Sequence, residues 1–246
     1  FYMLKKIVIL ITFLLCTLVC GAEGRVQKDT AVLNALSAKL HEYFEALKYE
    51  NIEVQKAECD FLIEAANSQD VRDFIAQTIY YHYIDSRIMG VEAVAVHLTD
   101  NWFVPEKVSF KDDSELFAAK IFAEFNRLSL VGNIAPELNV ETFDGDRHNL
   151  FGESGNGRFK VLYFYDTDCV NCRLESIMLR NILETEDFPV DLYAFYVGDD
   201  RESWSAYIAE KLTLERGNAS VVHLWDPSVD SDFQRKYGVL QTPRLF

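Results

Sequence analysis

Two cysteines three residues apart are the residues of this chain best suited to chemistry. They form the motif Cys169-Val170-Asn171-Cys172, and thiols at this spacing can close a small disulfide ring. The apolar and aromatic run at 159–165 predicts a buried strand, and apolar residues at helical spacing over 173–186 predict a helix. A CxxC between a strand and a helix indicates a redox motif.

The predicted helix start favours the reactive form of the first thiol. Unpaired N–H groups and the positive dipole end of a helix stabilise a thiolate. We therefore predict that Cys169 is the nucleophile and that Cys172, one turn inside the helix, is the resolving thiol. Asp166 and Asp168 oppose thiolate formation, whereas Arg173 favours it. These three residues are predicted to tune the redox potential, and their opposite signs leave the direction open.

Two other roles are open for the same cysteine pair. A structural disulfide needs nothing beyond the two thiols. A zinc site usually needs about four ligands, and the remaining candidates are Cys59, in a region of helical pattern, and the scattered His148 and His223. Cys59 itself is expected to be a packed helix residue, because free cysteine is commonly buried.

The composition is that of an acidic globular protein. The 246 residues are 49% hydrophobic and 26% charged, which suits one or two domains with folded cores. The formal net charge is −15 and the pI is about 4.7. Such a surface repels a phosphate backbone, so we expect no nucleic-acid partner.

The N-terminal segment has the order of a secretory signal. Lys5 and Lys6 precede an apolar run over residues 7–20, and small residues follow it. The prediction is a signal peptide over residues 1–22, since the run is short of the ~20 residues of a membrane span. An uncleaved anchor and lipid attachment at Cys20 are the alternatives, and both would tether the N-terminus to a membrane. Each route leads out of the cytoplasm, where disulfides persist.

The pattern changes near residue 131. Residues 25–130 carry apolar side chains at helical spacing, which predicts an all-α domain. From 131 to 246, strand-like and helix-like runs alternate, as in an α/β sheet with crossover connections. The expected strands are 138–143, 148–150, 159–165, 190–197 and 221–224, and the expected helices are 169–186, 201–216 and 232–237.

A proline at the start of the last apolar run is a second signal. Pro243 is awkward in a central strand because it lacks a backbone donor. A cis Thr242–Pro243 bond would explain its position, and cis bonds are nearly confined to proline. An ordinary trans turn proline is the alternative. Because the chain stops at Phe246 within this run, and residues precede Met3, we expect a partial sequence truncated at its C-terminus.

Taken together, these motifs give residues 131–246 a resemblance to the thioredoxin-like superfamily. Within it, this segment resembles the TlpA/ResA-type periplasmic thiol–disulfide oxidoreductases. The resemblance rests on the sequence Gly-Asn-Ile-Ala-Pro-Glu-Leu at 132–138, the Asp144-Gly145 turn, the strand entering the CxxC motif, and Thr242-Pro243. It covers just under half of the chain. It implies an α/β thioredoxin fold, with a central mixed sheet flanked by helices, preceded here by the helical domain.

The resemblance also implies a reaction. Cys169 would attack a substrate disulfide, Cys172 would release the product, and a cis Pro243 would lie beside them while the Thr242 backbone pairs with substrate. No cofactor or metal is implied. The partners would be a protein disulfide substrate and a redox protein that recycles the dithiol in the bacterial periplasm or cell envelope, with this chain as the reductant. A non-catalytic adapter with a structural disulfide, or a metal carrier using the CxxC, is the alternative.

Three positions depart from the family pattern. Asp168 stands where the family usually has Trp, and Asn171 stands where Pro is common. Tyr163 replaces the acidic residue that many thioredoxins bury six positions before the first cysteine. Both thiols are intact, but the potential, the proton relay and the substrate surface are left open.

Overall fold

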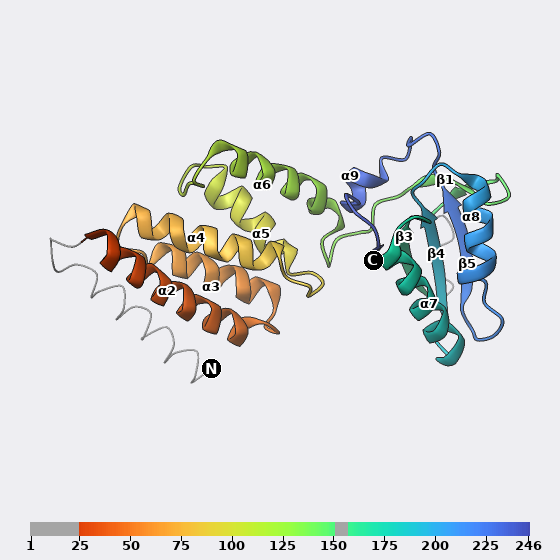
Figure 1. The fold of residues 1–246 in the computed structure, drawn as a ribbon, viewed down its shortest axis with the longest axis horizontal. Coiled ribbons are helices and arrows are strands. Elements are labelled where there is room, and N and C mark those ends of the chain that lie inside the picture. The colour runs from red at the N-terminus through yellow and green to blue at the C-terminus, as the bar shows by residue number, and fades with distance from the viewer. Residues whose placement is uncertain (1–24, 151–156) are drawn as a thin grey trace. The chain divides into compact units, whose positions relative to one another are not determined.

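The computed structural model describes residues 25–150 and 157–246 of the chain (Figure 1). The chain divides into two compact units, one ending at Asn133 and the other beginning at Ile134. The expected signal segment at 1–22, with Cys20, lies outside the described residues. Within the described ranges, no helix combines the length and the apolar composition needed to cross a membrane.

The first unit is helical. Its elements are α2 (Arg25–Leu47), α3 (Ile52–Glu64), α4 (Gln69–Ile84), α5 (Glu92–Leu98), the π-helical turn η2 (Thr99–Phe103), α6 (Asp113–Asn126) and the 3₁₀ turn η3 (Arg127–Ser129). Three of these helices have a polar N-cap residue whose side chain accepts a hydrogen bond from an N–H group of the first turn. These caps are Asn51 before α3, Ser68 before α4 and Asp112 before α6.

Apolar residues at helical spacing form the core of this unit. On α2 they are at most 1% exposed: Leu36, Leu40, Tyr43, Phe44 and Leu47. Asp60 on α3 adds a polar tie, because its carboxylate accepts from Trp102 Nε1 at 2.6 Å and contacts His97 Nε2 at 2.9 Å. These contacts connect α3 with α5 and η2.

The second unit is built on a six-stranded mixed sheet in the order β2-β1-β5-β4-β3-β6. The strands are β1 (Asn139–Thr142), β2 (Arg147–Asn149), β3 (Phe159–Tyr165), β4 (Val190–Tyr196), β5 (Ser220–Trp225) and β6 (Arg244–Leu245). The central strands β3, β4 and β5 are parallel, and the outer pairings are antiparallel. Parallel neighbours need crossover connections, which α7 and α8 supply.

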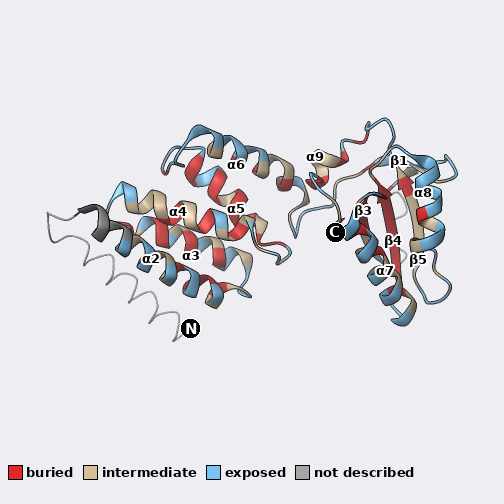
Figure 2. Cartoon of the chain, in the orientation of Figure 1, coloured by how far each residue is buried: buried red, intermediate tan, exposed pale blue. Residues whose placement is uncertain are grey.

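Helices cover both faces of this sheet: α7 (Val170–Thr185), α8 (Arg201–Tyr207) continued by the π-helical turn η4 (Ile208–Leu212), and α9 (Phe233–Tyr237). Alternate residues of β3 point to opposite faces. Leu162 and Phe164 pack in the core that includes α9, whereas Tyr163 and Tyr165 pack in the core that includes α7 and α8. Every residue of β4 is buried, as Figure 2 shows in red.

The predicted fold class, a mixed sheet flanked by helices after a helical region, is confirmed. The largest difference in the second unit is that the helix expected at 201–216 ends four residues earlier, at Leu212. The chain then turns back toward β5 through Gly217, whose φ is +99°. A Cβ at Gly217 would lie 2.4 Å from the Leu183 carbonyl oxygen, so this turn takes only glycine without rearrangement.

Arg158 joins the beginnings of three strands. Its Nε donates to Asp191 Oδ1 at 2.5 Å, and its Nη2 donates to the carbonyl oxygens of Val190 and Asn218 at 2.8 and 2.6 Å. Asp191 is 8% exposed and also accepts from Ser220 Oγ at 2.7 Å. The ion pair with Arg158 therefore offsets much of the free-energy cost of burying the Asp191 carboxylate.

We predict that Arg158→Ala lowers the free energy of unfolding by about 2–3 kcal/mol, because it removes an ion pair and a hydrogen bond from the buried Asp191 carboxylate. Denaturant unfolding of the full chain measures this loss. Arg216→Ala, in an exposed loop, is the matched control and should change stability by less than about 0.5 kcal/mol. Equal losses in the two variants would contradict the assigned role of Arg158.

Candidate functional site

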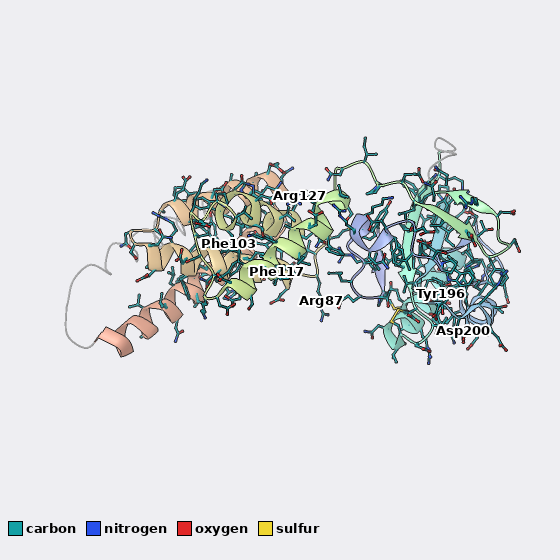
Figure 3. The ribbon with its side chains drawn as sticks, turned by 90° about the horizontal axis from the view of Figure 1, so that it is seen from above. Arg87, Phe103, Phe117, Arg127, Tyr196 and Asp200 are labelled. Atoms are coloured by element: carbon teal, nitrogen blue, oxygen red, sulfur yellow. A yellow bond between two sulfur atoms is a disulfide. The ribbon has the colours of Figure 1, made fainter. Side chains whose placement is uncertain are left out.

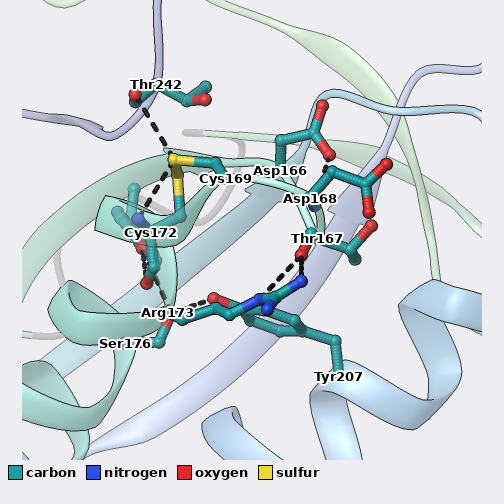
Figure 4. The surroundings of a disulfide bond; sticks show 10 residues. Asp166, Thr167, Asp168, Cys169, Cys172, Arg173, Ser176, Tyr207 and Thr242 are labelled. Atoms are coloured by element: carbon teal, nitrogen blue, oxygen red, sulfur yellow. Dashed lines mark hydrogen bonds between the residues drawn. A yellow bond between two sulfur atoms is a disulfide. The ribbon is translucent and has the colours of Figure 1, made fainter.

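The two cysteines of the motif form a disulfide at the beginning of α7 (Figure 4). Strand β3 ends at Tyr165, and Cys169 is the N-cap of α7. Cys169 is half-buried, whereas Cys172 is 0% exposed. An approaching sulfur therefore reaches Cys169 before Cys172, while the roles of nucleophile and resolving thiol stay predictions.

Backbone groups surround the sulfur of Cys169. The N–H of Cys172 donates to Cys169 Sγ at 3.1 Å, and the Thr242 carbonyl oxygen lies 3.5 Å from the same sulfur. After reduction, the helix N–H and the helix dipole would stabilise negative charge on Sγ. The Thr242 oxygen could accept a hydrogen bond from the protonated thiol. Cys169 Sγ therefore has a hydrogen-bond partner in place both as a thiolate and as a thiol.

The Thr242–Pro243 peptide bond is cis, as the resemblance implied. It leads directly into β6, which pairs antiparallel with β3. This pairing brings residue 242 to Cys169 although the two are 73 residues apart in sequence. The expected grouping of Cys169, Cys172, Thr242 and Pro243 is therefore present in the structure.

The charged residues beside the motif are held by backbone groups. The N–H of Asp168 donates to Asp166 Oδ1 at 3.1 Å. Arg173 donates through Nε and Nη2 to the Thr167 carbonyl oxygen at 3.2 and 3.1 Å (Figure 4). The guanidinium of Arg173 therefore fixes the loop before the helix. Its effect on the potential, like that of Asp166 and Asp168, stays a prediction.

A chain of three buried hydroxyl groups lies beneath Cys172. Tyr163 Oη donates to the Cys172 carbonyl oxygen at 2.9 Å and lies 3.1 Å from Ser176 Oγ, which in turn lies 2.9 Å from Tyr207 Oη. Burial raises the pKa of Tyr163 and that of Tyr207 above their ordinary values. This network occupies the place where many thioredoxins bury an acid, and it is neutral at physiological pH.

Sequence reasoning missed two members of this network. Ser176 follows Cys172 by four residues, so helical spacing could have placed both on the buried face of α7. Tyr207 comes from α8, 31 residues beyond Ser176 in sequence, and no local pattern pointed to it. Nearby, Trp204 Nε1 donates to Tyr165 Oη at 2.8 Å and stacks on Tyr196, which Figure 3 labels.

Two other candidates from the sequence, Cys59 and His223, are on α3 and β5. Cys59 is 0% exposed in the helical core, and burial raises the pKa of its thiol to about 12. His223 is partly buried on β5, and burial lowers its pKa to about 4. Across residues 25–150 and 157–246, no three or more His, Cys, Asp or Glu side chains group closely enough to hold a metal ion.

Comparison with known proteins identifies the fold. No protein-family model and no curated protein matches the sequence. Among solved structures, a thioredoxin-like protein from Bacteroides caccae aligns over 87% of this chain and 75% of its own, with 13% identity and a TM-score of 0.63. The chain has a thioredoxin-like fold.

A thiol-disulfide oxidoreductase from Bacteroides fragilis aligns over 45% of this chain and 79% of its own, at 17% identity and a TM-score of 0.37. The thioredoxin-like fold agrees with the parallel β3-β4-β5 core, the CxxC at the start of α7 and the cis peptide before β6.

We predict that Tyr163→Phe lowers the free energy of unfolding by about 1–3 kcal/mol between pH 6 and 9, because it removes a buried hydroxyl from the network. Burial raises the pKa of Tyr163 in the folded protein, so the unfolded chain loses the hydroxyl proton at a lower pH than the folded protein does. The stabilisation is therefore complete below about pH 10 and is lost as the pH rises above that value. Denaturant unfolding at several pH values measures both effects.

Tyr193→Phe, in the core on the opposite face of the sheet, is the control. A loss of stability from Tyr163→Phe that disappears between pH 4 and 7 would show that an ionised group, and not neutral hydroxyls, governs this site.

Proposed function

We propose that this chain is an extracytoplasmic thiol–disulfide oxidoreductase that reduces protein disulfides with Cys169 and Cys172. The supporting observation is that Cys169, at the beginning of α7, meets the carbonyl of Thr242 at a cis peptide bond. A disulfide that only stabilised the fold would need neither this exposure nor this carbonyl. The assignment therefore rests on the site and not on the weak similarity of sequence.

The reaction moves two electrons from the cysteine pair to a substrate. The Cys169 thiolate attacks one sulfur of the substrate disulfide, forming a mixed disulfide and releasing a substrate thiolate that takes a proton. Cys172 then loses its proton and attacks Cys169 Sγ. The second substrate thiolate leaves and is protonated, and the Cys169–Cys172 disulfide forms. A separate dithiol protein must reduce this disulfide before the next cycle.

The surroundings favour the reductant direction. A strongly stabilised thiolate makes a dithiol pair oxidising. Here the Cys172 N–H and the positive charge of Arg173 stabilise the thiolate, whereas the two carboxylates of Asp166 and Asp168 oppose it. The buried network below Cys172 adds no positive charge. These features support a pair that gives up electrons.

The proposed location follows from the N-terminal segment. Lys5, Lys6 and the apolar run at 7–20 support secretion. Lipid attachment at Cys20 would tether the protein to the outer face of a membrane. Either route brings the dithiol to the periplasm or cell envelope, where substrate disulfides form.

We predict that the full chain accelerates insulin reduction by dithiothreitol, and that Cys169→Ser reduces the added rate at least tenfold by removing the attacking sulfur. Cys172→Ser should instead accumulate the mixed disulfide, detected by mass spectrometry. Cys59→Ala, which removes a buried cysteine of the helical unit, is the matched control and should retain the activity.

Two results would overturn the proposal. A wild-type rate no higher than that of Cys169→Ser would make the disulfide structural and the protein an adapter. Stoichiometric zinc or copper in protein purified under reducing conditions, lost in Cys169→Ser, would make the pair a metal carrier.

A further inference from the structure

Helix α7 presents a line of exposed apolar side chains. Val170, Leu174, Met178 and Ile182 are 68%, 59%, 57% and 46% exposed. They are spaced by four residues and so follow one face of the helix. With a rise of 1.5 Å per residue, the line is about 18 Å long. We call these four residues the α7 apolar line.

The charged residues of α7 are mostly directed elsewhere. Arg173 donates to the Thr167 carbonyl, Arg180 Nη1 donates to the Glu210 carbonyl at 2.9 Å, and Glu184 Oε1 accepts from the Glu215 N–H at 2.9 Å. Glu175 is the remaining charged residue of α7. In a protein with a net charge of −15, a helix face with so little charge and four large apolar groups marks an interaction surface.

The α7 apolar line begins inside the reactive motif. Val170 is the residue after Cys169, and Leu174 follows Cys172 by two positions. A polypeptide whose disulfide has reached Cys169 therefore has part of its chain beside Val170. Extended chain spans ~3.3 Å per residue, so about five residues of a substrate could run along the line.

The chemistry of such a substrate follows from where disulfides lie in proteins. Cysteines are among the most buried residues. A chain that has lost its native packing exposes such disulfides together with the apolar side chains around them, and so presents both to a second protein. We propose that the α7 apolar line captures exposed apolar side chains of non-native, disulfide-bonded polypeptides. This proposal rests on the proposed reductase function and specifies its substrate class.

The test compares a protein and a small disulfide in single-turnover reactions. Reduced full-length protein is mixed with scrambled ribonuclease or with oxidised glutathione, and formation of the Cys169–Cys172 disulfide is followed by acid quench and mass spectrometry. For Leu174→Gln/Met178→Gln, we expect the ratio of second-order rate constants, ribonuclease over glutathione, to fall about tenfold, since two apolar contacts are lost.

Phe159→Gln is the matched control. Phe159 is 69% exposed at the opposite end of β3 from the motif, and its replacement should leave the ratio unchanged. An unchanged ratio in Leu174→Gln/Met178→Gln, or an equal fall in Phe159→Gln, overturns the capture proposal. Conversion of a wild-type dimer to a monomer by Leu174→Gln/Met178→Gln, seen by sedimentation, overturns it too by assigning the line to a second copy.

Failure of the underlying function gives a different result. If wild-type protein oxidises with neither ribonuclease nor glutathione, the reductase assignment fails, and the capture proposal fails with it. If wild-type protein reacts with both and the ratio is insensitive to Leu174 and Met178, only the capture proposal fails.

Discussion

The hydrogen bond from the Cys172 N–H to Cys169 Sγ is the interaction on which the proposed redox chemistry depends. It requires Cys169 to stand at the N-cap of α7, where N–H groups have no partner within the helix. That position is set by β3, which is hydrogen-bonded between β4 and β6. The strand ends at Tyr165, four residues before Cys169. The antiparallel β3–β6 pair places the Thr242 carbonyl against the same sulfur.

The interior below the disulfide is polar but uncharged. Tyr163, Ser176 and Tyr207 exchange hydrogen bonds with one another, and Tyr163 also binds the Cys172 carbonyl, so the first turn of α7 is anchored to the sheet. Burial keeps these hydroxyls protonated. The charges predicted to act on the pair lie outside this interior, on Asp166, Asp168 and Arg173. Because exposed charges are screened by salt, the potential of this pair should respond to ionic strength.

Local patterns were sufficient to predict most elements. The apolar run of β3 and the helical spacing in α7 each specify structure within a few residues. Contacts between segments far apart in the sequence could not be predicted from local patterns. Tyr207 reaches Ser176 only because α8 packs on the same face as α7, and Arg173 binds Thr167 only because the loop curls back. The end of η4 at Leu212, which continues α8, was likewise set by the turn at Gly217 and not by helix propensity.

The reduction potential of the Cys169–Cys172 pair distinguishes a reductant from an oxidant and from a structural disulfide. Full-length protein is equilibrated in glutathione or dithiothreitol redox buffers, and the oxidised fraction is quantified by alkylation and mass spectrometry. We expect a reversible two-electron transition near that of thioredoxin, about −270 mV. A potential near −120 mV would contradict the reductant assignment, and a disulfide that strong reductants leave intact in the folded protein would contradict thiol–disulfide exchange altogether.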